Sequence, residues 1–139
     1  MALVDYFLKL DGIDGESTDR DHKDAIEILS FSWGVLQETD PAGGGGAGGK
    51  AIVQDFHFTA NFSKASPALF LTCATGRHIR QGVLTGRSER LNGEFYKVTF
   101  TDVLVSSYQT GGSGEAVPTD QFSLNFNKIE YNGAAFDKG

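Results

Sequence analysis

The feature that most constrains the fold is the alternation of apolar and polar residues in several segments of the chain. In residues 52–62, Phe56 and Phe58 fall on one side, while His57 and Thr59 fall on the other. Successive side chains of a strand point to opposite faces, so apolar residues at every second position indicate a half-buried β-strand. We predict a strand over residues 52–62 in which six side chains face inward: Ile52, Gln54, Phe56, Phe58, Ala60 and Phe62.

Similar patterns recur and predict about seven strands in all. Residues 3–10, 25–35, 94–110 and 120–131 alternate, and Asn92-Gly93 is typical of a type I′ hairpin turn. Within residues 25–35 the apolar side switches near Leu29, from Ile26 and Ile28 to a set on the opposite face: Leu29, Phe31, Trp33 and Val35. Such a switch indicates a bulge or the twist of a barrel strand, and it leaves Ser30 and Ser32 pointing away from the aromatic side.

One segment carries a strong helix signal. Ser66 suits the N-cap, Pro67 the first helical position and Gly76 the C-terminal cap. Leu69, Phe70 and Cys73 share a face of this helix, which we expect to pack on the core. The predicted fold class is all-β: a compact antiparallel barrel or sandwich with one short flanking helix, forming a single domain over residues 1–139.

A glycine-rich run raises the possibility of a nucleotide site. Residues 44–50 spell G-x-x-x-x-G-K, but Ala51 stands where a phosphate-binding loop needs Ser or Thr for its metal ion. Such a loop must also open a helix, whereas the residues that follow here alternate like a strand. We therefore predict no nucleotide site and expect the run to serve another purpose.

The composition excludes several other functions. A net charge of −6 disfavours nucleic acid, whose binding requires Lys and Arg to neutralise phosphates. The single cysteine, Cys73, rules out a disulfide within the chain and a cysteine metal cluster, and we expect no cofactor and no metal. The N-terminus lacks the basic start of a signal peptide, and no apolar stretch is long enough to span a membrane.

No arrangement of residues in the sequence points to catalysis. His22, His57 and His78 are scattered, without the spacing of metal ligands. The acidic residues of segment 11–24 include Asp14, Glu16 and Asp19, which we interpret as a solvated surface loop rather than a pair of catalytic carboxylates. An enzyme is therefore the least favoured class.

Several ordered motifs together resemble a known family. They are "HKDAIEILSFSWGV", a glycine-rich loop, "VQDFHFT", "KASPALFLTCATGRHI" and "VLVSSYQTGGSG" followed by "TDQFSLNF". In this order, over about residues 2–131, they resemble the hemolysin-coregulated protein (Hcp) family, which supplies the tube subunit of bacterial type VI secretion. Members fold as a β-barrel with one flanking helix, form six-membered rings and stack them into a tube that a contractile sheath fires behind a spike protein.

The resemblance implies a role and a set of partners. We expect a non-enzymatic subunit that assembles with itself in the cytoplasm, carries effector proteins in the ring, and is secreted to the extracellular space or a target cell without a signal peptide. The expected partners are further copies, effectors, the spike protein and the sheath, with no membrane insertion. The family places an extended arm at the glycine loop, so we expect inter-subunit contacts from these residues: Thr39, Asp40, Gly43, Gly44, Gly45, Gly46, Gly48, Gly49 and Lys50.

Two serines and the number of copies in the assembly lead to further expectations. Ser30 and Ser32 are predicted to face the lumen of the ring and to contact effectors, because Phe31 and Trp33 must turn toward the core of the subunit. The alternative to a ring is a monomeric or dimeric β-barrel that holds a small ligand inside. The mass of the protein in solution distinguishes the two.

Overall fold

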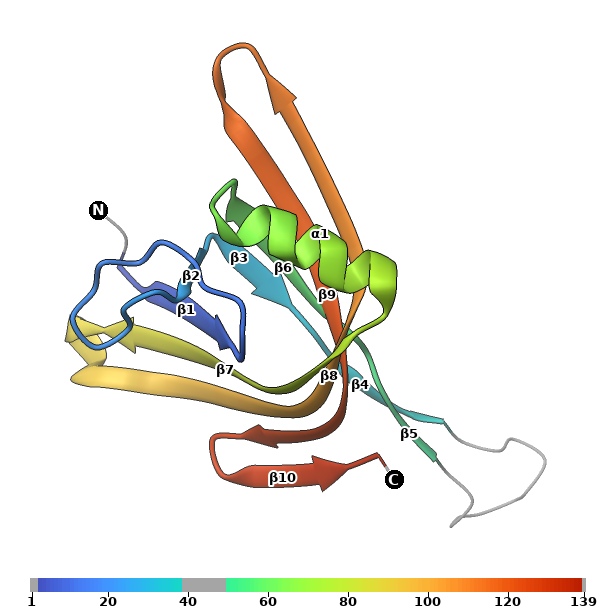
Figure 1. Ribbon diagram of the computed structural model, residues 1–139. Coiled ribbons are helices and arrows are strands. Elements are labelled where there is room, and N and C mark those ends of the chain that lie inside the picture. The colour runs from blue at the N-terminus through green and yellow to red at the C-terminus, as the bar shows by residue number, and fades with distance from the viewer. Residues whose placement is uncertain (1–2, 39–49, 139) are drawn as a thin grey trace.

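A computed structural model describes residues 3–38 and 50–138, and these form a set of strands with a single α-helix on their flank (Figure 1). The strands in chain order are β1 (Asp5–Leu10), β2 (Ile26–Ile28), β3 (Ser30–Ser32), β4 (Val35–Glu38), β5 (Lys50–Val53), β6 (Phe56–Asn61), β7 (His78–Ser88), β8 (Gly93–Ser113), β9 (Ala116–Tyr131) and β10 (Ala134–Asp137). The helix α1 spans Ala65–Thr75, and a single 3₁₀ turn, η1, spans Glu89–Leu91. The predicted all-β class with one flanking helix is confirmed; the number of strands in the described residues, ten, exceeds the seven predicted.

The main sheet is antiparallel and almost closes on itself. Its strand order is β2-β1-β7-β8-β9-β6-β3, and β10 pairs with the C-terminal end of β9, residues 128–131. The two outermost strands, β2 and β3, are consecutive in the chain, and the amide of Leu29 between them donates to the carbonyl of Thr59, 2.8 Å away. The chain therefore crosses from one edge of the sheet to the other at Leu29, which is where the sequence places the switch of the apolar side.

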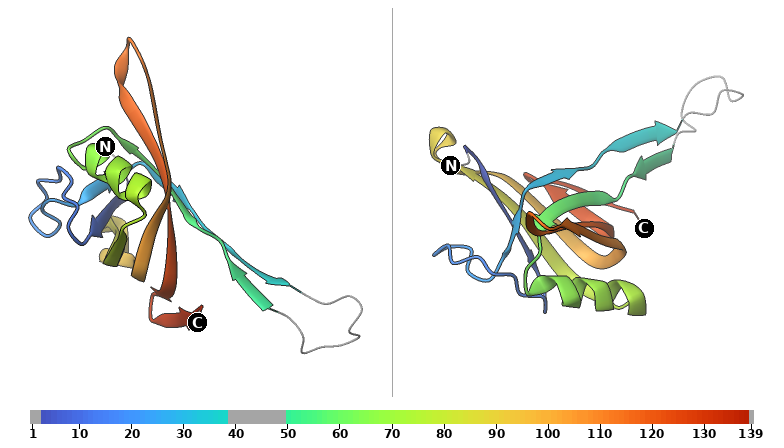
Figure 2. Two further views of the ribbon diagram at one scale, coloured as in Figure 1. Left: turned by 45° about the vertical axis from the view of Figure 1, so that its right-hand side comes forward. Right: turned by 90° about the horizontal axis from the view of Figure 1, so that it is seen from above.

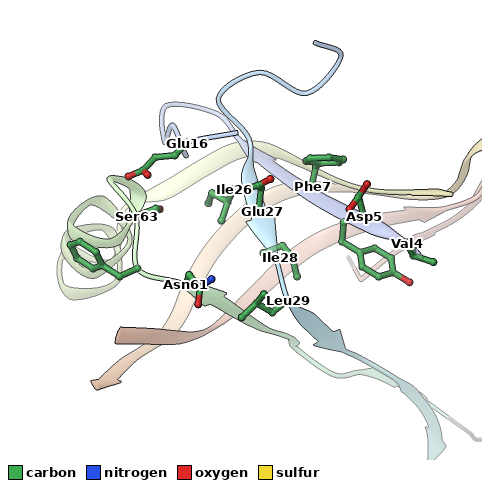
Figure 3. A pocket seen from close by; sticks show the side chains of 12 residues that line it. Val4, Asp5, Phe7, Glu16, Ile26, Glu27, Ile28, Leu29, Asn61 and Ser63 are labelled. Atoms are coloured by element: carbon green, nitrogen blue, oxygen red, sulfur yellow. The ribbon is translucent and has the colours of Figure 1, made fainter. Parts of the chain in front are cut away.

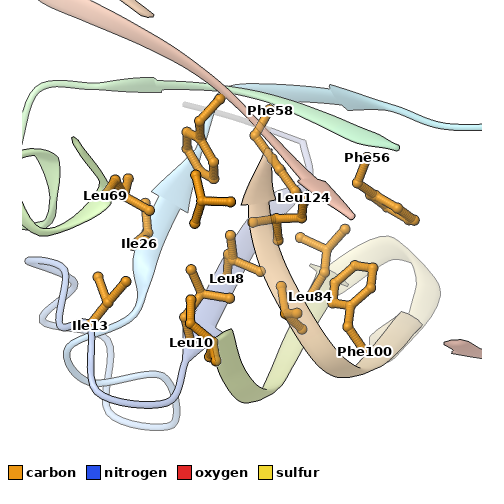
Figure 4. Packing of buried hydrophobic residues seen from close by; sticks show 14 of the residues in the cluster. Leu8, Leu10, Ile13, Ile26, Phe56, Phe58, Leu69, Leu84, Phe100 and Leu124 are labelled. Atoms are coloured by element: carbon orange, nitrogen blue, oxygen red, sulfur yellow. The ribbon is translucent and has the colours of Figure 1, made fainter. Parts of the chain in front are cut away.

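The interior of the barrel is filled by aromatic and aliphatic side chains (Figure 4). Phe56 is fully buried, with its ring centroid 4.7 Å from that of Phe100 and 5.6 Å from that of Phe58. Phe58 in turn stacks on Phe122 across the β6–β9 pair, with a centroid distance of 5.2 Å. Ring pairs of this kind favour a fixed geometry in addition to removing apolar area from water. The inward positions predicted for Phe56, Phe58 and Ala60 are confirmed.

The ends of the predicted strands differ from the structure. Residues 25–35 break into β2, β3 and the start of β4, and Leu29 and Val35 are exposed by 57% and 58% rather than buried. Residues 52–62 break at Gln54 and Asp55, and Ile52 and Phe62 are exposed as well. The predictions for these residues were wrong because Val35 and Ile52 lie on strands β4 and β5, which extend away from the body, and Leu29 and Phe62 lie at the ends of strands, so that no described residue covers them.

Helix α1 begins and ends close to the predicted positions. Gly76 adopts the left-handed conformation, with a φ of 68°, and its amide donates to the carbonyl of Cys73, as expected of a C-terminal cap. The prediction of Ser66 as N-cap was wrong: the helix starts at Ala65, and Ser66 is buried, with its hydroxyl donating to Asp120. Phe70 is 57% exposed, because the buried side of the helix runs through Leu69 and Thr72.

The β7–β8 hairpin is present, but its connection is longer than predicted. Ser88 pairs with Gly93, so the four residues between them, the 3₁₀ turn and Asn92, connect the strands. Asn92 has a φ of 62°, a left-handed conformation that Asn tolerates better than most residues.

The acidic segment 11–24 is fastened to the barrel rather than free in solvent. The guanidinium of Arg87 donates to both carboxylate oxygens of Asp19, at 2.9 and 2.7 Å, and the ring of His22 stacks on Phe7. Hydrogen bonding from Arg87 lowers the pKa of Asp19 to about 2.

In the part of the chain that the structure describes, no helix is long and apolar enough to cross a lipid bilayer.

Candidate assembly surfaces

The most distinctive surface is a polar sheet face formed by β3, β6, β9 and the distal half of β8, residues 105–113. Cross-strand pairing aligns polar residues in two rows: Ser32, His57, Ser123 and Ser107 in one, and Ser30, Thr59, Gln121 and Gln109 in the other. The same strands turn Phe56, Phe58 and Phe122 into the core, because alternate side chains point to opposite faces. We call these eight residues the polar face.

Ser30 and Ser32 therefore lie on one surface with partners that are distant in sequence, all of them at least partly exposed except Ser123, which is buried. A shallow depression of about 390 Å³ lies over this surface and is lined by both serines together with His57, Thr59 and Gln121. Sequence reasoning did identify the polar side of residues 52–62, but it could not align that side with residues 107–123. The register across three strands brings them together, and His57 is the only one of the eight that can carry a positive charge.

A hydrogen-bond network borders the polar face at the base of β6. Asp55 accepts a hydrogen bond from the hydroxyl of Ser106 and another from the amide of Asn125, both at 2.7 Å. Ser106 and Ser107 each also bond to the hydroxyl of Ser123, at 2.7 and 2.5 Å. These bonds hold a bulge of β8 between Val105 and Ser107 against its neighbours.

A second network joins the distal half of β8 to helix α1 beneath the polar face. The hydroxyl of Tyr108 donates to one oxygen of the buried Asp120, 3.0 Å away, and Ser66 from the helix donates to the other. Burial raises the pKa of Tyr108, so this phenol keeps the proton that it donates. The helix thereby supports the strands of the polar face from the core side.

The polar face ends in two strand edges that lack a ladder partner among the described residues. On one side, β3 pairs only with β6. On the other side, the pairing of β7 with β8 ends at Leu104, and from Val105 to Ser113 the strand β8 pairs only with β9. Free edges are templates for pairing with another chain, and these two have different sequences.

A two-stranded ribbon, β4 and β5, extends away from the body (Figures 1 and 2). Three of its apolar side chains are exposed: Val35 by 58%, Leu36 by 56% and Ile52 by 42%. Of the predicted contact loop, Lys50 lies at the start of β5, whereas Thr39, Asp40 and the glycines at 43–46, 48 and 49 lie outside the described residues. Residues 50–53 form a strand, so the glycine run is followed by a strand and not by the helix that a phosphate-binding loop requires; the strand begins two residues before the predicted start at Ile52.

A groove of about 420 Å³ lies where β2 diverges from the end of β6 (Figure 3). Its lining includes the carboxylates of Asp5, Glu16 and Glu27 and the exposed apolar side chains of Leu29 and Phe62. We call it the β2 groove. It was not predicted, because the residues that form it come from four separate segments of the chain.

The described residues do not form a cluster that is typical of a catalytic or metal site. They contain no group of three His, Cys, Asp or Glu side chains that could hold a metal ion. The acidic side chains considered for catalysis have separate structural partners: Lys9 donates to Asp14, the amide of Lys64 donates to Glu16, and Arg87 holds Asp19. The hydrogen bond from Lys9 also lowers the pKa of Asp14.

The known proteins to which this chain is similar are components of type VI secretion systems. A family model described as "Type VI secretion system effector, Hcp" matches residues 7–132. Protein hcp1 of Pseudomonas aeruginosa is 40% identical over 131 residues, which cover 91% of this chain and 81% of that protein. The crystal structure of Hcp1 from Salmonella typhimurium is 37% identical, with a TM-score of 0.81 over 97% of this chain and 92% of its own. A type VI secretion system effector from Yersinia pestis is 35% identical, with a TM-score of 0.78 over 91% of this chain and 86% of its own.

Proposed function

The chain belongs to the Hcp family and is a tube subunit of type VI secretion, and from this premise we propose that six copies close into a ring and that rings stack into a tube. The observation that carries the proposal is the pair of free edges that flank the polar face. One copy offers β3 and the distal half of β8, which are different surfaces. Contact between two different surfaces is heterologous, and it closes into a ring when the rotation between neighbours permits.

Pairing of these edges would satisfy backbone groups that each copy leaves open. The edge of β3 is three residues long, and the free part of β8 runs from Val105 to Ser113, so β3 of one copy can pair along part of β8 in the next. Main-chain hydrogen bonds supply the attraction in such strand addition. Six repeats would join the four-stranded polar face of each copy into one continuous wall.

That wall would line the central channel. Its hydroxyl, amide and imidazole groups come from the polar face, with Ser30 and Ser32 nearest the β3 edge. A surface without large apolar patches holds protein cargo weakly enough for release, whereas an exposed apolar wall would retain it. We propose that effector proteins contact Ser30 and Ser32 while they travel in the ring.

Hcp proteins are structural components of a secretion system and are not a known enzyme family. We propose that this chain likewise acts without a catalytic centre, assembles in the cytoplasm, and leaves the cell with the spike protein when the sheath contracts. A ligand-binding barrel is less well supported, because Phe56, Phe58, Phe100 and Phe126 occupy the interior.

The mass of the purified protein in solution tests the ring. Light scattering after gel filtration should give about 90 kDa, six times the 15.0 kDa of one chain, and electron microscopy should show closed rings. A species near one or two chain masses at high concentration, without rings, would contradict the proposal and favour the ligand-binding alternative.

Substitution of Ser32 tests the channel wall separately from the ring. Ser32→Arg places a long charged side chain on the exposed polar face, where it should reduce retention of a co-expressed effector at least about tenfold while rings persist. Gln81→Arg is the matched control, because Gln81 is exposed on β7, away from the polar face. Co-purification measures retention, and equal retention by both variants would remove Ser32 from the channel wall.

A further inference from the structure

We propose that His57 is the residue of the polar face that selects cargo, and that it favours effector segments rich in Asp and Glu side chains. The inference rests on the proposed function, because it takes the polar face as the wall of the channel. It goes beyond that function by stating the charge of the cargo and the residue that contacts it.

His57 lies within the polar face and not at its edge. Strand β6 runs between β3 and β9, so His57 stands directly opposite Ser32 on one side and Ser123 on the other. Side chains at directly opposite positions of an antiparallel pair have Cβ atoms about 5 Å apart. The imidazole of His57 is exposed and lines the depression of about 390 Å³. A group bound in this depression would therefore contact His57.

The polar face also presents hydrogen-bond donors that are free to bind a ligand. Ser107 and Ser123 bond to each other. The remaining side chains of the face form no hydrogen bond or ion pair with any described residue: Ser30, Ser32, His57, Thr59, Gln109 and Gln121. Each of them has an N–H or O–H group to donate, whereas a carboxylate has only acceptors. Carboxylate side chains are therefore complementary to this surface.

The distribution of charge favours the same ligand. Although the chain carries a net charge of −6, no Asp, Glu, Lys or Arg belongs to the polar face or lines its depression, and the strands β3, β9 and distal β8 place no such residue beside His57. Asp55 lies two positions before His57 on the same side of β6, and both of its oxygens already accept hydrogen bonds, from Ser106 and Asn125. A histidine side chain becomes positive when it gains a proton. An acidic segment would thus be attracted at His57 and would meet no unpaired carboxylate on the face.

Repetition in the ring would strengthen a contact that is weak in one copy. In the proposed assembly, His57 of every copy faces the same channel. Several weak contacts on one wall hold a cargo more tightly than any single contact does. Because each contact remains weak, the cargo can still leave the channel.

Binding of synthetic peptides to the full-length protein tests the selection. The probe is a short peptide of alternating Glu and Ser with a neutral fluorescent dye, and its counterpart has Gln in place of every Glu. Fluorescence anisotropy measures the affinity at pH 6 and pH 8, where Glu side chains of the peptide stay ionised. We expect the acidic peptide to bind at least about fivefold more tightly at pH 6 than at pH 8, because more histidine is protonated at pH 6.

Variants assign the effect to one imidazole. His57→Gln should abolish the preference for the acidic peptide, and His57→Lys should keep it at both pH values. His78→Gln is the matched control and should behave like the parent protein, because His78 is exposed on β7, away from the polar face, and pairs with Asp102 at 2.7 Å. Ser32→Arg should weaken binding despite its positive charge, because its long side chain fills the depression beside His57.

The outcomes separate this inference from the proposed ring. If rings form but the protein binds both peptides equally, or if His57→Gln keeps the preference, the selection by His57 is wrong and the ring stands. Tighter binding of a peptide of alternating Lys and Ser would overturn the selection as well. If no rings form at high concentration, the proposed function fails, and the same binding measurements on single copies still decide whether His57 selects acidic segments.

Discussion

Strands β5 and β6 come from one stretch of sequence, residues 50–61, and differ in what covers them. In β6, Phe56, Phe58 and Ala60 are at most 2% exposed, because the rest of the barrel lies over that side of the strand. In β5, Ile52 remains 42% exposed, because no part of the described subunit lies over the ribbon. The apolar side chains of one alternating segment thus stabilise the subunit in β6, whereas in β5 an apolar side chain is left exposed and is available for assembly.

The border between the two regions is marked by Asp55. It lies between β5 and β6 and is held by the hydroxyl of Ser106 and the amide of Asn125. The amide of Gln54, the residue before it, donates to the carbonyl of Gly34 at the base of β4. These bonds fix where the ribbon leaves the body, so the ribbon projects as an oriented element even though its own strands have no core.

The comparison predicts a large difference between two apolar substitutions. Phe56→Ala removes a fully buried ring and should lower the free energy of unfolding by about 3–5 kcal/mol. Ile52→Ala removes a side chain of the ribbon and should change it by less than about 0.5 kcal/mol in dilute, unassembled protein. Urea denaturation of both variants at low concentration measures the difference.

Concentration dependence sharpens this prediction. If Ile52 is covered by another copy, Ile52→Ala should become more costly as the protein is concentrated and assembles, since assembly stabilises the folded state. Phe56→Ala should cost about the same at every concentration. A large effect of Ile52→Ala in dilute protein would mean that the ribbon packs within its own subunit, which would end the distinction between the two regions.

The body was largely predictable from the sequence, because its information is local. The alternation at Phe56, Phe58 and Ala60 fixes which side chains share a face, and Gly76 ends the helix for a reason that lies in its own backbone. Where a local rule failed, a distant residue decided: Ser66 is buried because Asp120, 54 positions away, accepts its hydroxyl.

The surfaces for assembly were predictable only in part. The pattern indicates that Ser30 and Ser32 point away from the core, but their alignment with His57 and Ser123 depends on a register that spans three strands. The pattern also assigned Ile52, Leu29 and Phe62 to the core, because alternation shows which residues share a face and not whether anything covers that face. All three side chains are exposed in the described subunit.

Acid should distinguish the two regions by a smaller effect. The body holds its acidic segment through the ion pair of Asp19 with Arg87, whose side chains are 24% and 26% exposed, whereas Glu38 and Lys50 of the ribbon form no ion pair with a described residue. Hydrogen bonding to Arg87 lowers the pKa of Asp19 from 3.8 to about 2, so the carboxylate stabilises the folded state above pH 4. That contribution is lost as the pH falls from about 4 to about 2, where Asp19 takes up a proton in the folded protein. The melting temperature of Asp19→Asn should therefore lie below that of the parent protein at pH 6, by a smaller difference than Phe56→Ala causes. The melting temperatures of Asp19→Asn and the parent protein should converge near pH 2.

Glu115→Gln is the matched control, in the exposed turn between β8 and β9. Its melting temperature should show no such convergence with that of the parent protein, because the Glu115 carboxylate has no partner among the described residues. A deficit of Asp19→Asn that persists unchanged at pH 2 would mean that the acidic segment is held by its packing, with His22 against Phe7, and not by its charge.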